Sequence, residues 1–217
     1  MRQLSFPHDD AVTCLVEQVS QFVAAADSLD DMALLGSSRC HGWTALDVIV
    51  HVQLGLQEMA VGTTSRTSEP PDRDAASYWA DQPDDREEDP VPHILWLRRV
   101  ASAYTRPTHA VRHLNGAAET TIRAVRATPQ SCVEFQGKCM RSGDFLATWV
   151  VELAVHQLDL VLDETPVGIA WTRTSLEAVA DADLPADLDD KSATLVGLGR
   201  VPCPPSVRLQ PPFPISL

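Results

Sequence analysis

The sequence predicts an all-α protein: a four-helix bundle with a proline-rich lid loop and a short irregular C-terminal extension. Long segments in which apolar residues recur every three or four positions predict the helices. Strand-like alternation is weak and confined to one short stretch, so the strand content should be small. Prolines gather in a polar connection in the middle of the chain and again at its C-terminal end, where they exclude long helices.

The first helix is expected over residues 9–29, because the apolar residues of this segment fall on one side of a helix. Asp9 or Asp10 can cap its start by accepting hydrogen bonds from free backbone amides. A loop punctuated by glycines, LLGSSRCHGWT, then separates this helix from the next.

The second helix is expected over residues 45–60. Thr44 is its expected N-cap, and Asp47, three residues later, is an acid at a position that reinforces a helix start. Gly62 ends the helix. The segment ALDVIVHVQLGL is strongly apolar, so a histidine in its middle is an unusual polar residue there.

Residues 62–90 form a polar, proline-bearing excursion, which we interpret as a lid with a short helix over residues 73–80. Connections of this length are usually either lids or disordered segments. Helical patterns return over residues 93–104 and 108–127. Pro107 either separates two helices here or kinks one long helix.

The stretch SCVEFQGKCMRSG predicts a loop or a small hairpin. Residues 144–162 are apolar on almost every side, which is typical of a central helix. Cys132 and Cys139 flank the predicted turn and could face each other. The five cysteines are odd in number and widely spaced, however, which favours reduced thiols over a disulfide framework.

We interpret residues 1–165 as a metal-binding four-helix bundle and residues 166–217 as a C-terminal extension packed on it. Within the extension, residues 172–182 and 190–199 could each form a short helix. The final segment, VPCPPSVRLQPPFPISL, contains six prolines and is expected to be an extended strap or a frayed end.

A net charge of −13 argues against nucleic acid as a partner, because proteins that bind the phosphate backbone present clustered Lys and Arg. It also disfavours an anionic membrane surface, and no run of 18 or more apolar residues predicts a membrane span. The N-terminal residues do not resemble a signal peptide. We therefore expect a cytoplasmic monomer or homodimer whose partners are small molecules.

Three polar residues stand out in the apolar helices. Glu152 and His156 are four residues apart in WVVELAVHQLDL, so both side chains leave the same face of a helix. His51 lies in the middle of the second helix. Two imidazoles and a carboxylate brought together in a bundle would form a three-ligand metal site of the kind that catalytic zinc requires. The alternatives are a Glu152–His156 salt bridge and a hydrogen-bonded core histidine.

Asp47 and Asp159 lie one turn from His51 and His156 and could hold the second nitrogen of each imidazole. They could equally be a helix-start acid and a local cap. Arg141 is a candidate for holding an anionic substrate, against the alternative of a surface charge. Trp149 is a candidate for substrate stacking, although core packing explains it as well.

Two motifs resemble those of a known family. CHGWTALDVIVHV resembles the GW-x-x-x-D-x-x-x-H motif of the DinB-like superfamily, and within it the mycothiol-dependent maleylpyruvate isomerase and mycothiol S-transferase family. WVVELAVHQLDL resembles the E-x-x-x-H-x-x-D motif of the same family. The resemblance implies a four-helix bundle and a metal, usually zinc, bound by His51, Glu152 and His156. It also implies mycothiol as a cofactor or co-substrate, activated as a thiolate.

The leading hypothesis is a metal-dependent enzyme that transfers a low-molecular-weight thiol to a small electrophile, or uses the thiol to isomerise it. A second hypothesis keeps the metal but drops the thiol, so that the metal activates water or polarises a carbonyl in a biosynthetic step. A third is a non-catalytic stress or binding protein on the same fold, in which the metal is structural. The Ala-, Arg- and Asp-rich composition with few lysines suggests a GC-rich genome, as in the actinobacteria that make mycothiol.

Overall fold

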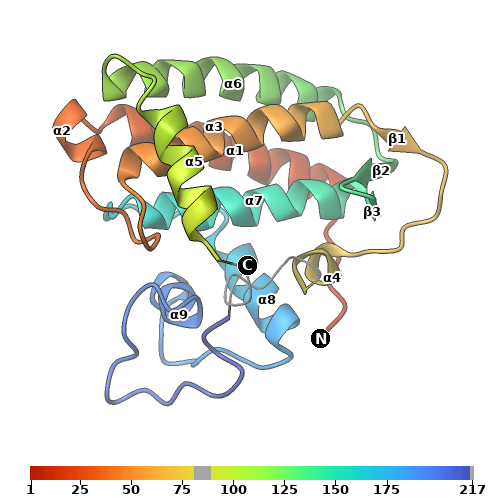
Figure 1. Ribbon diagram of the computed structural model, residues 1–217. Coiled ribbons are helices and arrows are strands. Elements are labelled where there is room, and N and C mark those ends of the chain that lie inside the picture. Colours follow the sequence, from red (N-terminus) through yellow and green to blue (C-terminus); the bar gives the residue numbers. More distant parts are fainter. Residues whose placement is uncertain (81–88, 216–217) are drawn as a thin grey trace.

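The computed structural model describes residues 1–80 and 89–215 (Figure 1). The described chain is mostly helical, with one small three-stranded sheet. This confirms the prediction of a helical protein with little strand. Within the described residues, no helix is both long and apolar enough to cross a lipid bilayer.

Four long helices lie side by side and form the main body (Figure 1): α1 (His8–Asp27), α3 (Ala45–Gly62), α6 (Pro107–Ala127) and α7 (Ser142–Asp159). α1 packs on α7 and α6, and α3 packs on α6 and α7. Large side chains from all four helices are fully buried between them, among them Phe22, Ile49, Leu114 and Phe145. Each such side chain stabilises the fold by roughly 1.5–3 kcal/mol through removal of apolar surface from water.

The two helix starts differ in how well the sequence predicted them. The Thr44 side chain accepts a hydrogen bond from the backbone amide of Asp47, and Asp47 accepts one from the amide of Thr44, which confirms the predicted capping box. At α1 the N-cap is Pro7, which makes no side-chain cap, so the prediction of an Asp9 or Asp10 cap is wrong. Both acids lie in the first turn instead, where negative charge favours the helix dipole.

α7 is the central helix, and almost all of its residues are buried. The N-terminal segment of the chain crosses its first turn, where Asp144 accepts hydrogen bonds from the amide of Phe6 at 2.8 Å and the hydroxyl of Ser5 at 3.2 Å. A Cβ atom on Gly143 would overlap the backbone oxygen of Phe6. Glycine is therefore required where the two backbones meet.

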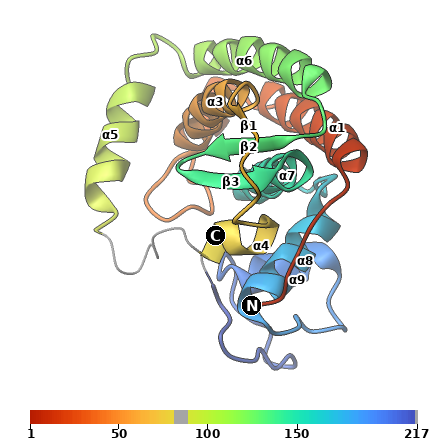
Figure 2. The ribbon, with the colours of Figure 1, turned by 90° about the vertical axis from the view of Figure 1, so that its right-hand side faces the viewer.

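The sheet lies across one end of the long helices (Figure 2) and consists of β1 (Arg66–Thr67), β2 (Cys132–Phe135) and β3 (Lys138–Arg141). All pairs are antiparallel in the order β1-β2-β3, which confirms the predicted hairpin. Gln136 and Gly137 form its two-residue turn, and both have positive φ, as hairpin turns of this length require. The register pairs Cys132 with Arg141 and Cys139 with Glu134, and both cysteines are free thiols.

The connections carry three shorter helices: α2 (Asp31–Leu34), α4 (Ala75–Ala80) and α5 (Val91–Ala101). α5 ends at Ala101 and α6 begins at Pro107, so this proline starts a second helix and does not kink a single one. Part of the expected lid, residues 81–88, lies outside the described residues, and the lid itself stays a prediction.

The C-terminal section contains the two predicted helices, α8 (Ile169–Ala180) and α9 (Asp190–Gly197). Both lie on the side of α7 opposite α6 (Figure 1), and α8 packs directly on α7. Val151 and Val155 of α7 share an apolar cluster with Leu176 and Leu198 of this section. α7 is therefore covered on both sides, which explains why its sequence is apolar all round.

Candidate metal centre

Three side chains from two helices converge beside the C-terminal half of α7. His51 comes from α3, and Glu152 and His156 come from successive turns of α7. Oε1 of Glu152 lies 3.0 Å from Nε2 of His51 and 3.3 Å from Nε2 of His156. One ligand atom from each of the three residues lies within 4.8 Å of the other two. The structure thus brings together the three residues that the sequence singled out.

The cluster is open on one side. His51 and Glu152 keep 29% and 25% of their side-chain surface exposed, whereas His156 keeps 10%. His51 and Glu152 are therefore in contact with solvent. His156 is held deeper, against the protein.

Opposite charges stabilise each other within the cluster. Burial alone would raise the pKa of Glu152, but the charge of His156 and hydrogen bonds from both histidines hold that pKa well below its ordinary value. Burial alone would lower the pKa of His156, but the charge of Glu152 and the hydrogen bond to Asp159 hold that pKa well above its ordinary value. Without a metal, each of the two residues therefore favours the charged form of the other.

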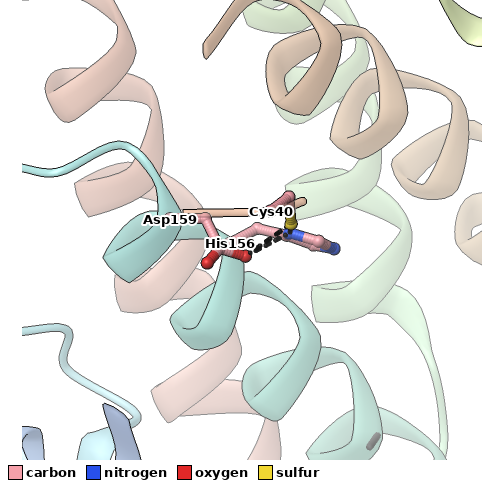
Figure 3. A group of neighbouring side chains, drawn as sticks. All are labelled: Cys40, His156 and Asp159. Atoms are coloured by element: carbon pink, nitrogen blue, oxygen red, sulfur yellow. Dashed lines mark hydrogen bonds and ion pairs between the residues drawn. The ribbon is translucent and has the colours of Figure 1, made fainter. Parts of the chain in front are cut away.

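The other nitrogen of His156 faces a second set of polar groups (Figure 3). Nδ1 lies 3.2 Å from Oδ2 of Asp159 and 3.9 Å from Sγ of Cys40. The Cys40 thiol donates to the same carboxylate oxygen over 2.9 Å, and Nε of Arg200 donates to the other oxygen, Oδ1, over 3.1 Å. Asp159 therefore holds the imidazole so that Nε2 points at Glu152.

The Cys40 thiol is largely buried beside His156 and Asp159. Burial raises the pKa of its thiol and outweighs the opposing effect of His156. Because Cys40 lies on the Nδ1 side of His156, it is not placed beside the Nε2 atom that faces Glu152. His41, the neighbouring residue that could have served as a further ligand, is exposed.

Two aromatic residues that were not among the predicted site residues, Trp43 and His93, border the cluster. The ring of Trp43 lies 5.1 Å from that of His51 and 6.1 Å from that of His156, nearly parallel to the latter. The ring of His93, from α5, lies 5.7 Å from that of Trp43. The GW dipeptide, which precedes the N-cap of α3, is the sequence signal that could have identified Trp43. No local pattern marked His93.

The remaining predicted residues lie in other places. Asp47 forms the capping box with Thr44 and lies 3.9 Å from Arg98, so its role behind His51 stays a prediction. Arg141 precedes α7 and borders a small polar hollow with Asp72 and Asp74. Its eleven-residue separation from Glu152 corresponds to about 16 Å of helix. The structure therefore does not bring Arg141 to the cluster.

Trp149 is buried, with 9% of its surface exposed, and packs close to Gly55 and Phe135. Its indole N–H has no hydrogen-bond partner within the part of the chain that the structure describes. This environment agrees with core packing.

The donor set fits a tetrahedral divalent metal. Zinc bonds of about 2.0–2.1 Å place neighbouring ligand atoms about 3.3–3.4 Å apart. The two Oε1–Nε2 distances, 3.0 and 3.3 Å, are close to this separation. Two imidazoles and one carboxylate are also a ligand set that zinc commonly takes, with a further position left for an exchangeable ligand.

The sequence profile of the mycothiol maleylpyruvate isomerase N-terminal domain matches residues 15–161, about two thirds of the chain. The chain belongs to this family. Membership confirms the resemblance carried by the motifs around His51 and Glu152. The region that matches the mycothiol maleylpyruvate isomerase N-terminal domain contains all three clustered residues, together with Cys40 and Asp159, but not Arg200.

Two solved structures share the fold. The crystal structure of a mycothiol-dependent maleylpyruvate isomerase is 18% identical, with a TM-score of 0.54. A histidine-to-alanine mutant of a mycothiol-dependent maleylpyruvate isomerase is 17% identical, with a TM-score of 0.55. In each comparison, 79% of this chain and 68% of the other are covered. No curated protein matches the chain.

Proposed function

We propose that this protein is a metal-dependent enzyme that uses a low-molecular-weight thiol, mycothiol, to isomerise a small electrophilic substrate or to modify it by thiol transfer. The observation that carries the proposal is the convergence of Glu152 with Nε2 of His51 and of His156 on a side that solvent reaches. The family supports a mycothiol-dependent isomerase in particular. The four long helices are then the DinB-like bundle that carries the site.

His51, Glu152 and His156 would hold the metal, and zinc is the ion that best suits two imidazoles and one carboxylate. When bound, such an ion acts as a Lewis acid and lowers the pKa of a coordinated thiol, so that the thiolate is available at neutral pH. Because His51 and Glu152 are the exposed members, the thiol would approach from their side.

The surrounding residues orient the ligands and limit access of water. Asp159 lies within hydrogen-bond distance of Nδ1 of His156, and a proton held on Nδ1 would leave the Nε2 lone pair available to the metal. Trp43 covers one flank of both imidazoles with an apolar ring. His93 continues this aromatic wall toward α5 and would border the substrate.

The chemistry of a thiolate and a conjugated cis-alkene accounts for isomerisation. Sulfur adds to an alkene carbon and the π electrons move onto the conjugated carbonyl. The former double bond then rotates, and elimination restores the alkene and releases the thiolate unchanged. A substrate with a leaving group, or an epoxide, would instead keep the sulfur and make the enzyme a transferase. Maleylpyruvate is the first substrate to test, because the structural neighbours are isomerases of this compound by name.

The test combines metal analysis of the purified protein with mass spectrometry of products from maleylpyruvate and other electrophiles, with and without mycothiol. We expect about one divalent metal per chain at the three-ligand site and turnover that requires the thiol. Alanine at His51 should abolish both, whereas alanine at His109, a histidine on α6 outside the cluster, should leave both unchanged. Metal-dependent turnover without any thiol would favour the thiol-independent alternative. Bound metal without turnover of any substrate would favour the non-catalytic alternative, in which the metal is structural.

A further inference from the structure

We propose that Arg200, which follows α9 in the C-terminal section, is a positioning residue for the candidate metal ligand His156. The inference rests on the proposed function, because it concerns how the same site is held. It makes the C-terminal section part of the metal centre, although this section lies outside residues 15–161 that match the family.

The contacts form a chain from the guanidinium to the imidazole. Nε of Arg200 donates to Oδ1 of Asp159 at 3.1 Å, and Oδ2 of Asp159 faces Nδ1 of His156 at 3.2 Å. The two carboxylate oxygens thus contact different partners: Oδ1 contacts the C-terminal section, and Oδ2 contacts the candidate metal ligand. A carboxylate held at both ends cannot rotate away from the imidazole, so Nε2 stays aimed at Glu152.

Arg200 is also needed for charge balance. The Asp159 side chain has no exposed surface, and a buried carboxylate is costly unless it is paired and hydrogen-bonded. Arg200 provides a positive partner for this buried carboxylate from the C-terminal section, with Nε 3.1 Å from Oδ1 of Asp159.

The backbone after α9 delivers Arg200 to this position. Gly199 has φ +67 and donates from its amide to the oxygen of Val196 at 3.0 Å. The amide of Arg200 donates to the oxygen of Leu195 at 2.8 Å. These two hydrogen bonds and the left-handed glycine are a Schellman motif, in which Arg200 is the second residue after the helix cap. Leu195 itself packs on Leu158 of α7, one residue before Asp159.

The same carboxylate ties the loop before α3 to the site. Cys40 donates its thiol to Oδ2 of Asp159, and Nη2 of Arg200 lies 3.7 Å from Sγ of Cys40. The amide of Arg39 also donates to the backbone oxygen of Asp159. Trp43, which covers both imidazoles, belongs to this loop. A loosened Arg200 would therefore loosen the aromatic flank as well.

Arg200→Gln tests the proposal, with Arg200→Lys as the conservative rescue and Arg173→Gln as the matched control. Arg173 is likewise a partly buried guanidinium of the C-terminal section, but it pairs with Glu177 and Asp190 and not with the site. Cobalt(II) and zinc(II) affinities are measured by competition titration, and the absorption spectrum of the cobalt form reports ligand geometry. The ¹⁵N chemical shifts of His156 report which nitrogen carries the proton.

We expect Arg200→Gln to weaken metal binding by about 10–100-fold, the usual effect of losing an outer contact to a metal ligand. It should also shift the cobalt spectrum and the ¹⁵N chemical shifts of His156 in the metal-bound form, because Asp159 no longer holds the imidazole in one orientation. Arg200→Lys should restore part of the affinity, and Arg173→Gln should leave affinity and spectrum unchanged even if it lowers the melting temperature. Wild-type affinity, spectrum and ¹⁵N shifts in Arg200→Gln would overturn the inference.

If Arg200→Gln does not fold, the inference is tested by NMR on the wild-type protein. Zinc titration should shift the Nε–H resonance of Arg200 and leave that of Arg173 in place, and an unmoved Arg200 resonance would overturn the inference. A wild-type protein that binds no divalent metal would overturn the proposed function and this inference together. Metal binding that is insensitive to Arg200 would overturn the inference alone.

Discussion

Oε1 of Glu152 lies 3.0 Å from Nε2 of His51, a residue 101 positions away in the chain. The same oxygen lies 3.3 Å from Nε2 of His156. One carboxylate oxygen between two imidazole nitrogens can be balanced by a proton on nitrogen or by a shared cation. Protons and a divalent metal therefore compete for the same small group of atoms.

Glu152→Gln should lower zinc affinity by about 100-fold or more, because removing a direct ligand charge costs more than the 10–100-fold typical of outer contacts. A competition titration with a chromophoric chelator measures the change. Glu58→Gln is the control, since Glu58 is an exposed glutamate at the far end of α3. Zinc affinity of Glu152→Gln within threefold of wild type would remove Glu152 from the ligand set.

Zinc affinity should fall as pH falls from about 8 to 5, because His156 must lose a proton to bind metal and its pKa is raised in the metal-free protein. Each binding event should release protons, which can be counted by calorimetry in buffers of different ionisation enthalpy. Affinity that does not change across this range would contradict ligation by His156.

The free energy of unfolding of the metal-free protein should depend on pH. His156 should set the upper end of the stable pH range, and Glu152 should set the lower end. The raised pKa of His156 stabilises the fold fully below its unfolded pKa of about 6.5, and this stabilisation is lost as pH rises through the folded pKa. The lowered pKa of Glu152 stabilises the fold above its unfolded pKa of about 4.3, and this is lost as pH falls. Urea unfolding of the metal-free protein should show both contributions between about pH 4.3 and 6.5. In Glu152→Gln, the free energy of unfolding should change less with pH at both ends of this range. A pH profile identical to that of the wild type would count against the ion pair between Glu152 and His156.

Gly143→Ala should destabilise the protein by about 1–3 kcal/mol, the usual cost of overpacking. The added methyl group would overlap the backbone oxygen of Phe6, which cannot move as a flexible side chain can. Gly116→Ala is the matched control: its Cβ would meet no atom within 4 Å, and it lies exposed inside α6. Helix propensity predicts a stabilisation of about 0.5–1 kcal/mol there. Equal free energies of unfolding for the two variants would refute the close crossing at Gly143.

Trp43→Ala should leave zinc affinity within about threefold of wild type, because the indole borders the imidazoles as an aromatic neighbour and supplies no metal ligand. It should raise the KM for the thiol or its electrophile by about tenfold, since about 1–1.5 kcal/mol of aromatic contact is lost. Trp171→Phe is the control, because Trp171 lies in α8 of the C-terminal section, where it stacks on Phe6 of the N-terminal segment. Steady-state kinetics of both variants give the KM values. An unaltered KM in Trp43→Ala would place the substrate elsewhere.

Features that depend on neighbours within a few residues were predictable from the sequence. The Thr44 capping box, the turn at Gly137 and the long helices follow from local hydrogen bonds and from the 3.6-residue period. The same period placed Glu152 and His156 on one helix face, and their polarity among apolar residues identified them as unusual. Helix geometry also separates Arg141 from Glu152 by about 16 Å, which the sequence alone could have shown.

The helices, the hairpin and the three residue types that can hold a metal were predictable, because local periodicity and polarity encode them. The positions of Cys40, Trp43, His93 and Arg200 around those residues depend on tertiary packing. Arg200 is 41 residues from Asp159, and Cys40 is 119 residues from it. Contacts over such separations depend on how whole helices pack and where each backbone turn ends, and no short sequence pattern records either.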